Sequence, residues 1–325
     1  MHRPAARAIV AALAGATLLL TACAPTSGNS ESGSSASAGD GIVEVVASTS
    51  VYGDIVSSIG ADKVRVTSII TRTSQDPHSY EATAQDRLAV SRAKLIIENG
   101  GGYDDFLTKL VSDTGADTGR VLSAAEISGL DPASTPASAG TSSEAGTPEH
   151  GGFNEHVWYN FEAMAKLADA IAGKLGTQDS DSAAVFTKNA ETFKSSLKGL
   201  SKTEGDINAK HDGAPVAITE PMPLYLLQAA GLVNKTPEEF SAAIEEGTDV
   251  PVAVLKEATD QIAQKDVKLL AYNDQTEGPQ TEALKKAAEA AGVPVVNFTE
   301  TLPQGTNYLD WMDANVRNIA EALSQ

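Results

Sequence analysis

The chain has 325 residues, a formal net charge of −19 and a single cysteine. Such an excess of acid repels the phosphates of nucleic acids, so we expect no nucleic-acid partner. One cysteine cannot form an internal disulfide. The length is sufficient for two lobes of ordinary size.

The N-terminus is typical of an export signal. Residues 1–22 contain Arg3 and Arg7 and an apolar run that is too short for an ordinary membrane span. The sequence LTAC at residues 20–23 resembles a bacterial lipobox, in which the cysteine is acylated after cleavage of the signal. The resemblance implies that Cys23 anchors the exported protein to the outer face of the cytoplasmic membrane. The alternative is an ordinary signal peptide with an incidental cysteine.

The rest of the chain divides by composition. Residues 23–41 contain almost no bulky apolar side chain, so we expect a flexible, lipidated tether. We then expect an N-terminal α/β lobe at residues 42–179, a connecting helix at 180–210 and a C-terminal α/β lobe at 211–325. Within the first lobe, residues 130–153 are rich in Ser, Gly, Pro and Thr and predict a mobile loop.

Short β-branched runs alternate with helix-like segments in the first lobe. Strands are predicted at 42–48, 63–70 and 94–99, and helices at 51–59, 82–93, 103–113 and 154–175. Asn154 is the expected cap of the last of these helices. The alternation is typical of a parallel sheet that is flanked by helices.

The second lobe repeats this pattern after the long helix, which has few helix breakers along its length. Strands are predicted at 214–220, 267–273 and 293–300, and helices at 222–232, 251–266, 281–292 and 308–323. The predicted fold class is therefore α/β, with two lobes that each contain a mainly parallel sheet and are joined by one long helix.

Four candidate site residues emerge from this arrangement. Ligands of open α/β sheets bind beyond the carboxyl ends of the strands, and three candidates lie at such ends. His78 follows the second predicted strand in a loop stiffened by Pro77, Glu220 ends the first strand of the second lobe, and Glu300 follows its last strand. His156 lies at the start of a predicted helix. Two imidazoles and two carboxylates form a compact ligand set for a divalent transition metal.

Two motifs carry a resemblance to a known family. The sequences DPHSYEAT around His78 and EHVWYN around His156, with the export signal and lipobox, resemble the zinc- and manganese-binding solute receptors of bacterial ABC importers. The resemblance covers most of the chain from residue 42 onward. It implies a metal cleft between the lobes, with His78, His156, Glu220 (in AITEP) and Glu300 (in NFTET) as ligands.

The chain departs from the family pattern in two places. The family usually has Asp where this chain has Glu300, so Asp274 and Glu277 are alternative ligands. Many members also have DPHVW where this chain has NEHVW. In addition, Glu220 stands where zinc-type relatives often carry histidine. Two carboxylates make a hard ligand set, which favours manganese, although zinc binds nearly any such site tightly.

The resemblance implies a lipid-anchored, monomeric receptor that delivers Mn²⁺ or Zn²⁺ to a membrane permease with a cytoplasmic ATPase. We expect no enzyme, because a complete protein-supplied shell leaves no open position for a reactive water. One alternative is an exported zinc-dependent hydrolase with Glu300 as base, although its usual H-E-x-x-H signature is absent. Another is a surface adhesin in which the metal only stabilises the fold. Each residue also has an ordinary structural explanation, such as packing of His156 beside Trp158.

Overall fold

A computed structural model describes residues 42–131 and 153–325 of the chain. The predicted signal peptide, the tether with Cys23 and almost all of the predicted loop at 130–153 lie outside these residues. The described residues belong to one contiguous folded unit. No helix in the described part of the chain has the length and apolar character needed to cross a membrane.

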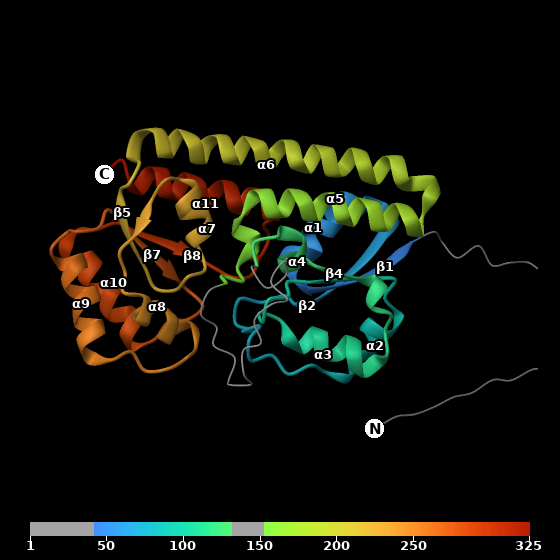
Figure 1. Ribbon diagram of the computed structural model, residues 1–325, viewed down its shortest axis with the longest axis horizontal. Helices are drawn as coiled ribbons and strands as arrows, with labels where there is room; N and C mark the ends of the chain where they lie inside the picture. Colours follow the sequence, from blue (N-terminus) through green and yellow to red (C-terminus); the bar gives the residue numbers. More distant parts are fainter. Residues whose placement is uncertain (1–41, 132–152) are drawn as a thin grey trace, which may run out of the picture. The chain divides into compact units, whose positions relative to one another are not determined.

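Each lobe is built on a parallel sheet of four strands (Figure 1). The strand order is β2-β1-β3-β4 in the first sheet and β6-β5-β7-β8 in the second, so the two sheets share one topology. The strands are β1 (Val43–Thr49), β2 (Val64–Ile70), β3 (Leu95–Glu98), β4 (Val121–Ser123), β5 (Pro215–Ile218), β6 (Val233–Asn234), β7 (Leu270–Asn273) and β8 (Val295–Phe298). The predicted fold class is confirmed.

Helices cover both sheets and connect the strands. They are α1 (Ser50–Gly60), α2 (Ala84–Arg92), α3 (Asp105–Thr114), α4 (Ala124–Ser128), α5 (Phe161–Gln178), α6 (Ala183–His211), α7 (Leu224–Ala229), α8 (Glu238–Glu245), α9 (Val252–Ala263), α10 (Pro279–Ala291) and α11 (Tyr308–Ala322). Because helices cover its faces, a central strand such as β1 (VEVVAST) is apolar and buried along nearly its whole length.

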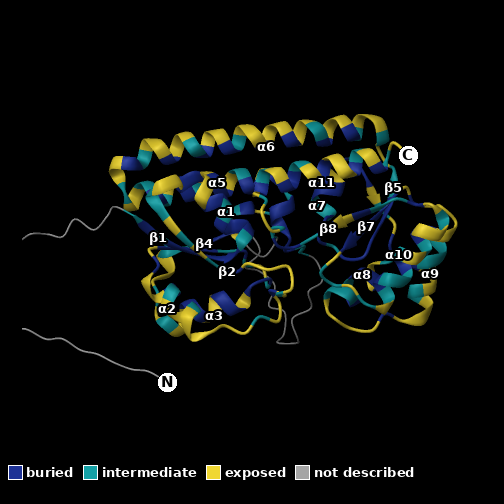
Figure 2. Cartoon of the chain, turned by 180° about the vertical axis from the view of Figure 1, so that it is seen from behind, coloured by how far each residue is buried: buried dark blue, intermediate teal, exposed yellow. Residues whose placement is uncertain are grey.

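Helix α6 runs along both lobes and has 29 residues, which corresponds to about 44 Å. It packs on α1 and α5 of the first lobe and on α7 and α11 of the second. Its buried residues recur every three or four positions, and exposed residues fill the positions between them (Figure 2). The buried positions are Phe186, Ala190, Phe193, Leu197, Leu200, Glu204 and Ile207.

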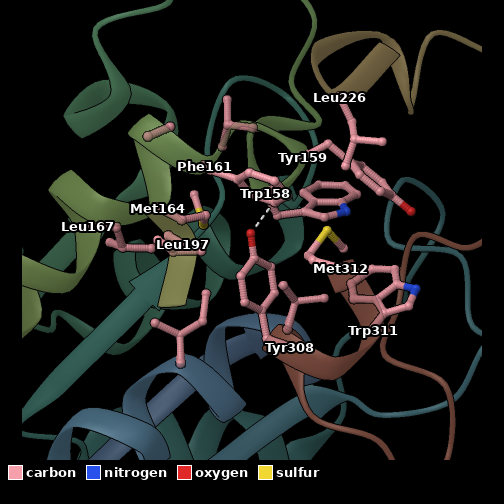
Figure 3. Packing of buried hydrophobic residues seen from close by; sticks show 14 of the residues in the cluster. Trp158, Tyr159, Phe161, Met164, Leu167, Leu197, Leu226, Tyr308, Trp311 and Met312 are labelled. Atoms are coloured by element: carbon pink, nitrogen blue, oxygen red, sulfur yellow. Dashed lines mark hydrogen bonds between the residues drawn. The ribbon is translucent and has the colours of Figure 1, made fainter. Parts of the chain in front are cut away.

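A single hydrophobic cluster joins the two lobes beneath α6 (Figure 3). Trp158 and Tyr159 from the first lobe lie against Tyr308 and Trp311 from α11. The hydroxyl of Tyr308 donates to the Trp158 carbonyl at 2.6 Å, and that of Tyr159 donates to the Thr299 carbonyl at 2.8 Å. Buried aromatic contacts and these hydrogen bonds therefore fix the segment beside His156 against the second lobe.

The prediction that a helix begins at or near Asn154 is wrong. Residues Val157–Tyr159 form a 3-10 turn, and α5 begins only at Phe161. Asn160 is its cap, because the side chain of Asn160 accepts a hydrogen bond from the Ala163 amide. Asn154 does not cap a helix, because its side-chain oxygen contacts the amide and Nδ1 of His156.

The structure also contains elements that the sequence analysis did not predict, namely β4, α4, β6 and α8. Most of them have five residues or fewer, which leaves little periodicity to detect. Strand β5 ends at Ile218, so Glu220 lies two residues beyond the strand rather than at its end.

Candidate metal centre

His78 lies in the loop between β2 and α2. The carboxylate of Asp76 accepts hydrogen bonds from the His78 amide at 2.9 Å and from the Ser79 hydroxyl at 2.7 Å. This turn, with Pro77 inside it, restricts the backbone that carries the imidazole. The ring of His78 packs edge-on against Tyr103. The loop therefore presents an imidazole from a constrained position.

His156 is buried, with 1% of its surface exposed. The side-chain oxygen of Asn154 lies 3.1 Å from the His156 amide and 2.8 Å from its Nδ1. Because the oxygen already accepts from the amide, the favourable tautomer carries its proton on Nδ1 and leaves Nε2 as the free nitrogen. The Asn154 amide group in turn donates to the Pro221 carbonyl at 3.0 Å, next to Glu220.

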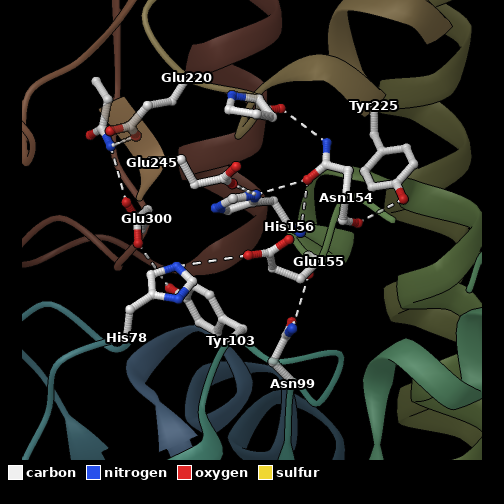
Figure 4. Close-up of polar contacts among 12 residues, drawn as sticks. His78, Asn99, Tyr103, Asn154, Glu155, His156, Glu220, Tyr225, Glu245 and Glu300 are labelled. Atoms are coloured by element: carbon white, nitrogen blue, oxygen red, sulfur yellow. Dashed lines mark hydrogen bonds and ion pairs between the residues drawn. The ribbon is translucent and has the colours of Figure 1, made fainter. Parts of the chain in front are cut away.

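The two predicted carboxylates lie together at the carboxyl edge of the second sheet. Glu220 and Glu300 are 3% and 5% exposed, respectively. The side-chain amide of Asn273, at the end of β7, donates to both of them, at 3.0 Å in the case of Glu300. Tyr103 from the first lobe also donates to Glu300, at 3.3 Å. The fold thus brings residues that are distant in sequence around a common point (Figure 4).

A cavity of about 430 Å³ lies at this point and has walls from both lobes. It is lined by Asp76, His78, Ser79, His156, Glu220, Ile244, Glu245, Glu246, Gly247, Thr276 and Glu300. All four expected ligands are among these residues. Asp274 and Glu277 are not, and the Glu277 carboxylate lies 3.8 Å from the ammonium group of Lys285. Cys23 lies outside the described residues.

The electrostatics of the cavity favour a cation. Burial, and secondly the charge of Glu220, raises the pKa of Glu300 to about 8. Burial also raises the pKa of Glu220, and Oε1 of Glu220 has no hydrogen-bond partner among the described residues. Burial, and then the charge of His78, lowers the pKa of His156 to about 3, which keeps its imidazole neutral. A dication would neutralise the buried carboxylates and bind the free nitrogen.

Two further acids belong to this neighbourhood and were missed by the sequence analysis. Glu245, at the end of α8, has an oxygen 3.8 Å from Nδ1 of His156, and its pKa is raised to about 8 by burial and then by the charge of Glu155. Glu155 has an oxygen 3.8 Å from Nε2 of His78. The departure NEHVW could have drawn attention to Glu155, and the spacing of Phe240 and Ala243 could have revealed α8.

Comparisons with known proteins identify the relatives of this chain. The ZnuA family, described as zinc-uptake complex component A, periplasmic, matches residues 45–322. The manganese ABC transporter substrate-binding lipoprotein scaA of Streptococcus gordonii is 26% identical over 318 residues, covering 94% of this chain and 95% of that protein.

Solved structures show the same fold. The laminin-binding adhesin Lmb of Streptococcus agalactiae, solved as a mutant, has a TM-score of 0.69 at 21% identity, covering 86% of this chain and 99% of that one. The periplasmic zinc-binding protein TroA of Treponema pallidum has a TM-score of 0.65 at 22% identity, with the same coverage.

Proposed function

The chain belongs to the ZnuA family of periplasmic zinc-uptake components, and we propose that it captures its cargo ion in the cavity between the lobes. It is a substrate-binding lipoprotein of an ABC manganese or zinc uptake system, and not an enzyme. The zinc-dependent hydrolase considered from the sequence is therefore set aside.

One observation carries the proposed site. His78, His156, Glu220 and Glu300 are separated by up to 222 positions along the chain, yet all four line the same cavity. Two imidazole nitrogens and two carboxylates are ligands that Mn²⁺ and Zn²⁺ both accept. Because such ligands must be deprotonated to bind a metal, we expect the affinity to fall in acid.

We propose Mn²⁺ as the preferred cargo, with Zn²⁺ as the close alternative. The carboxylates of Glu220 and Glu300 make the ligand set harder than one with three imidazoles, and harder sets suit manganese. The Streptococcus gordonii relative is named as a manganese transporter component, whereas the family description names zinc.

Delivery requires partners that the family function implies. We propose that acylated Cys23 holds the protein on the outer face of the cytoplasmic membrane, where it passes the ion as a monomer to a permease coupled to a cytoplasmic ATPase. Replacement of Cys23 by Ala should release the protein from the membrane and lower cellular uptake of the metal. Unchanged membrane attachment of this variant would contradict the anchor.

Calorimetric titration of single variants with Mn²⁺ and Zn²⁺ tests the site. We expect His78→Ala, His156→Ala, Glu220→Gln and Glu300→Gln each to weaken binding by at least about tenfold. His211→Ala, at the end of α6, and Glu277→Gln are matched controls outside the cavity and should bind like wild type. Wild-type binding in all four site variants would refute the site, and weakened binding in Glu277→Gln would favour the alternative ligands.

Adhesion is not proposed for this chain. The similarity to the laminin-binding adhesin is 21% in sequence, which supports a common fold only. Elemental analysis of the purified protein, followed by competition between Mn²⁺ and Zn²⁺, would identify the cargo directly.

A further inference from the structure

Glu155 immediately precedes His156 and has a rigid backbone. Its carbonyl accepts hydrogen bonds from the side-chain amide of Asn99 at 2.9 Å and from the Val157 amide at 2.7 Å. Asn99 is itself held by the hydroxyl of the buried Tyr52. Glu155 is 8% exposed, so its carboxylate is kept close to the protein interior.

The carboxylate of Glu155 lies beside both histidines of the site (Figure 4). One ligand atom from each of His78, Glu155 and His156 falls within 4.8 Å of the other two. Among the described residues, no other group of three or more histidines, cysteines and acids has its ligand atoms this close together.

A second observation indicates that the adjoining cavity, whose lining includes both histidines but not Glu155, suits a cation. Oε1 of Glu220 is buried and aimed into the cavity without a hydrogen-bond partner among the described residues. None of the described residues that line the cavity is Lys or Arg. A cation bound beside the two imidazoles would offset the repulsion between the ionised forms of these acids.

We propose that Glu155 is an additional metal ligand that favours manganese over zinc, an inference that rests on the proposed function. Zn²⁺ is satisfied by four ligands in a tetrahedron, a number that His78, His156, Glu220 and Glu300 already supply. Mn²⁺ takes more ligands and suits carboxylate oxygens, so it can use the oxygen of Glu155 as well. Loss of this carboxylate should then cost manganese more than zinc.

The test is a titration of the full-length protein, purified in detergent, with Mn²⁺ and Zn²⁺. We expect Glu155→Gln to weaken Mn²⁺ binding by about 10–100-fold and Zn²⁺ binding by only about threefold or less. X-ray absorption of the Mn²⁺-loaded proteins supplies a readout that a purely structural role would not change. It should show one light neighbour fewer around manganese in the variant than in wild type.

Glu246→Gln is the matched control, because Glu246 is an exposed residue of the cavity lining and carries the same charge outside the histidine group. This variant should bind Mn²⁺ and Zn²⁺ only slightly more weakly than wild type, and by the same factor for both metals. The inference is wrong if Glu155→Gln leaves both affinities unchanged, or lowers them by the same factor, while wild type binds metal. If wild type binds neither metal, the proposed function fails and the inference fails with it.

Discussion

The two lobes share one strand topology but contribute different expected ligands to the cavity, both histidines from the first lobe and Glu220 and Glu300 from the second. The first lobe supplies the two imidazoles. Asp76 accepts a hydrogen bond from the backbone amide of His78, and the side-chain oxygen of Asn154 lies against Nδ1 of His156. The second lobe supplies buried carboxylates. Glu220 and Glu300 share the single amide of Asn273 between them.

This difference indicates how the ion and the fold depend on each other. The nitrogen donors can be held in place without metal at little electrostatic cost. The buried carboxylates are costly to ionise side by side, which raises the pKa of Glu300 to about 8, and a bound cation would remove that cost. We therefore expect loss of an imidazole mainly to remove binding, and loss of a carboxylate to change the stability of the metal-free protein as well.

The largest expected effect is on stabilisation by metal in His156→Ala. A ligand at about 1,000 times its Kd stabilises a protein by about 4 kcal/mol, and this variant should lose most of that increment. Scanning calorimetry with and without Mn²⁺ measures it, with His211→Ala as the control. If Mn²⁺ raises the melting temperature of His156→Ala as much as that of wild type, His156 is not a metal ligand.

The next largest expected effect is on the pH dependence of stability, and it comes from a buried acid in the connecting helix. Glu204 is buried in α6, and burial raises its pKa from 4.5 to about 8. Because the folded protein holds the proton of Glu204 more tightly than the unfolded chain does, the contribution of this group to stability is fully present below pH 4.5. It is lost as the pH rises through 8. The free energy of unfolding of Glu204→Gln, relative to that of wild type, should therefore increase by on the order of 3 kcal/mol between these pH values.

Chemical denaturation of the metal-free protein at pH 5 and pH 8 measures this difference. Asp206→Asn on the same helix is a suitable control, because Asp206 is exposed and pairs with Lys202. A stability difference between Glu204→Gln and wild type that does not grow with pH would show that the Glu204 carboxyl is not desolvated in the fold.

A smaller effect is expected for Glu300→Gln in the metal-free protein. Removal of one of two neighbouring buried carboxylates should raise the free energy of unfolding by about 1–2 kcal/mol, while stabilisation by Mn²⁺ is lost. His78→Ala should lose the stabilisation by Mn²⁺ without the gain. Thermal unfolding in a chelator compares the two variants, and a destabilised Glu300→Gln would remove the proposed contrast between the lobes.

The smallest effect is expected for the residue that orients His156. Asn154→Ala should weaken metal binding by about tenfold, because Nδ1 of His156 loses its acceptor. Asn154→Asp keeps an oxygen at this position and should recover most of the affinity. The nitrogen chemical shifts of His156 report the tautomer. Equal binding by Asn154→Ala and wild type would show that the imidazole is oriented by its packing alone.

Much of the fold could be predicted because its signals are local. A β-branched run such as IVEVVAS predicts a buried strand from its own residues, and the uninterrupted stretch around Phe193 predicts a long helix. The start of α5 was predicted wrongly, because Asn154 has the chemistry of a helix cap but uses its oxygen on His156 instead. The spacing of apolar residues in the sequence does not reveal competing contacts of this kind.

The candidate site was predictable where a motif marked it, as for His78 and His156. Glu220 and Glu300 were placed by their positions after strands, and their role as ligands remains our proposal. Glu155 and Glu245 were not predicted as site residues, because their significance depends on which histidine they face. Glu245 reaches the cavity only through the packing of α8.

By itself, the sequence determined the alternation of strands and helices, the long connecting helix and the two histidine motifs. Hydrogen bonding and apolar periodicity within short segments are sufficient for these features. Only the tertiary structure decided that His78 and Glu300 line one cavity, and that Asn273 holds two carboxylates together. Such proximity arises when two separately built lobes pack against each other, which no local pattern encodes.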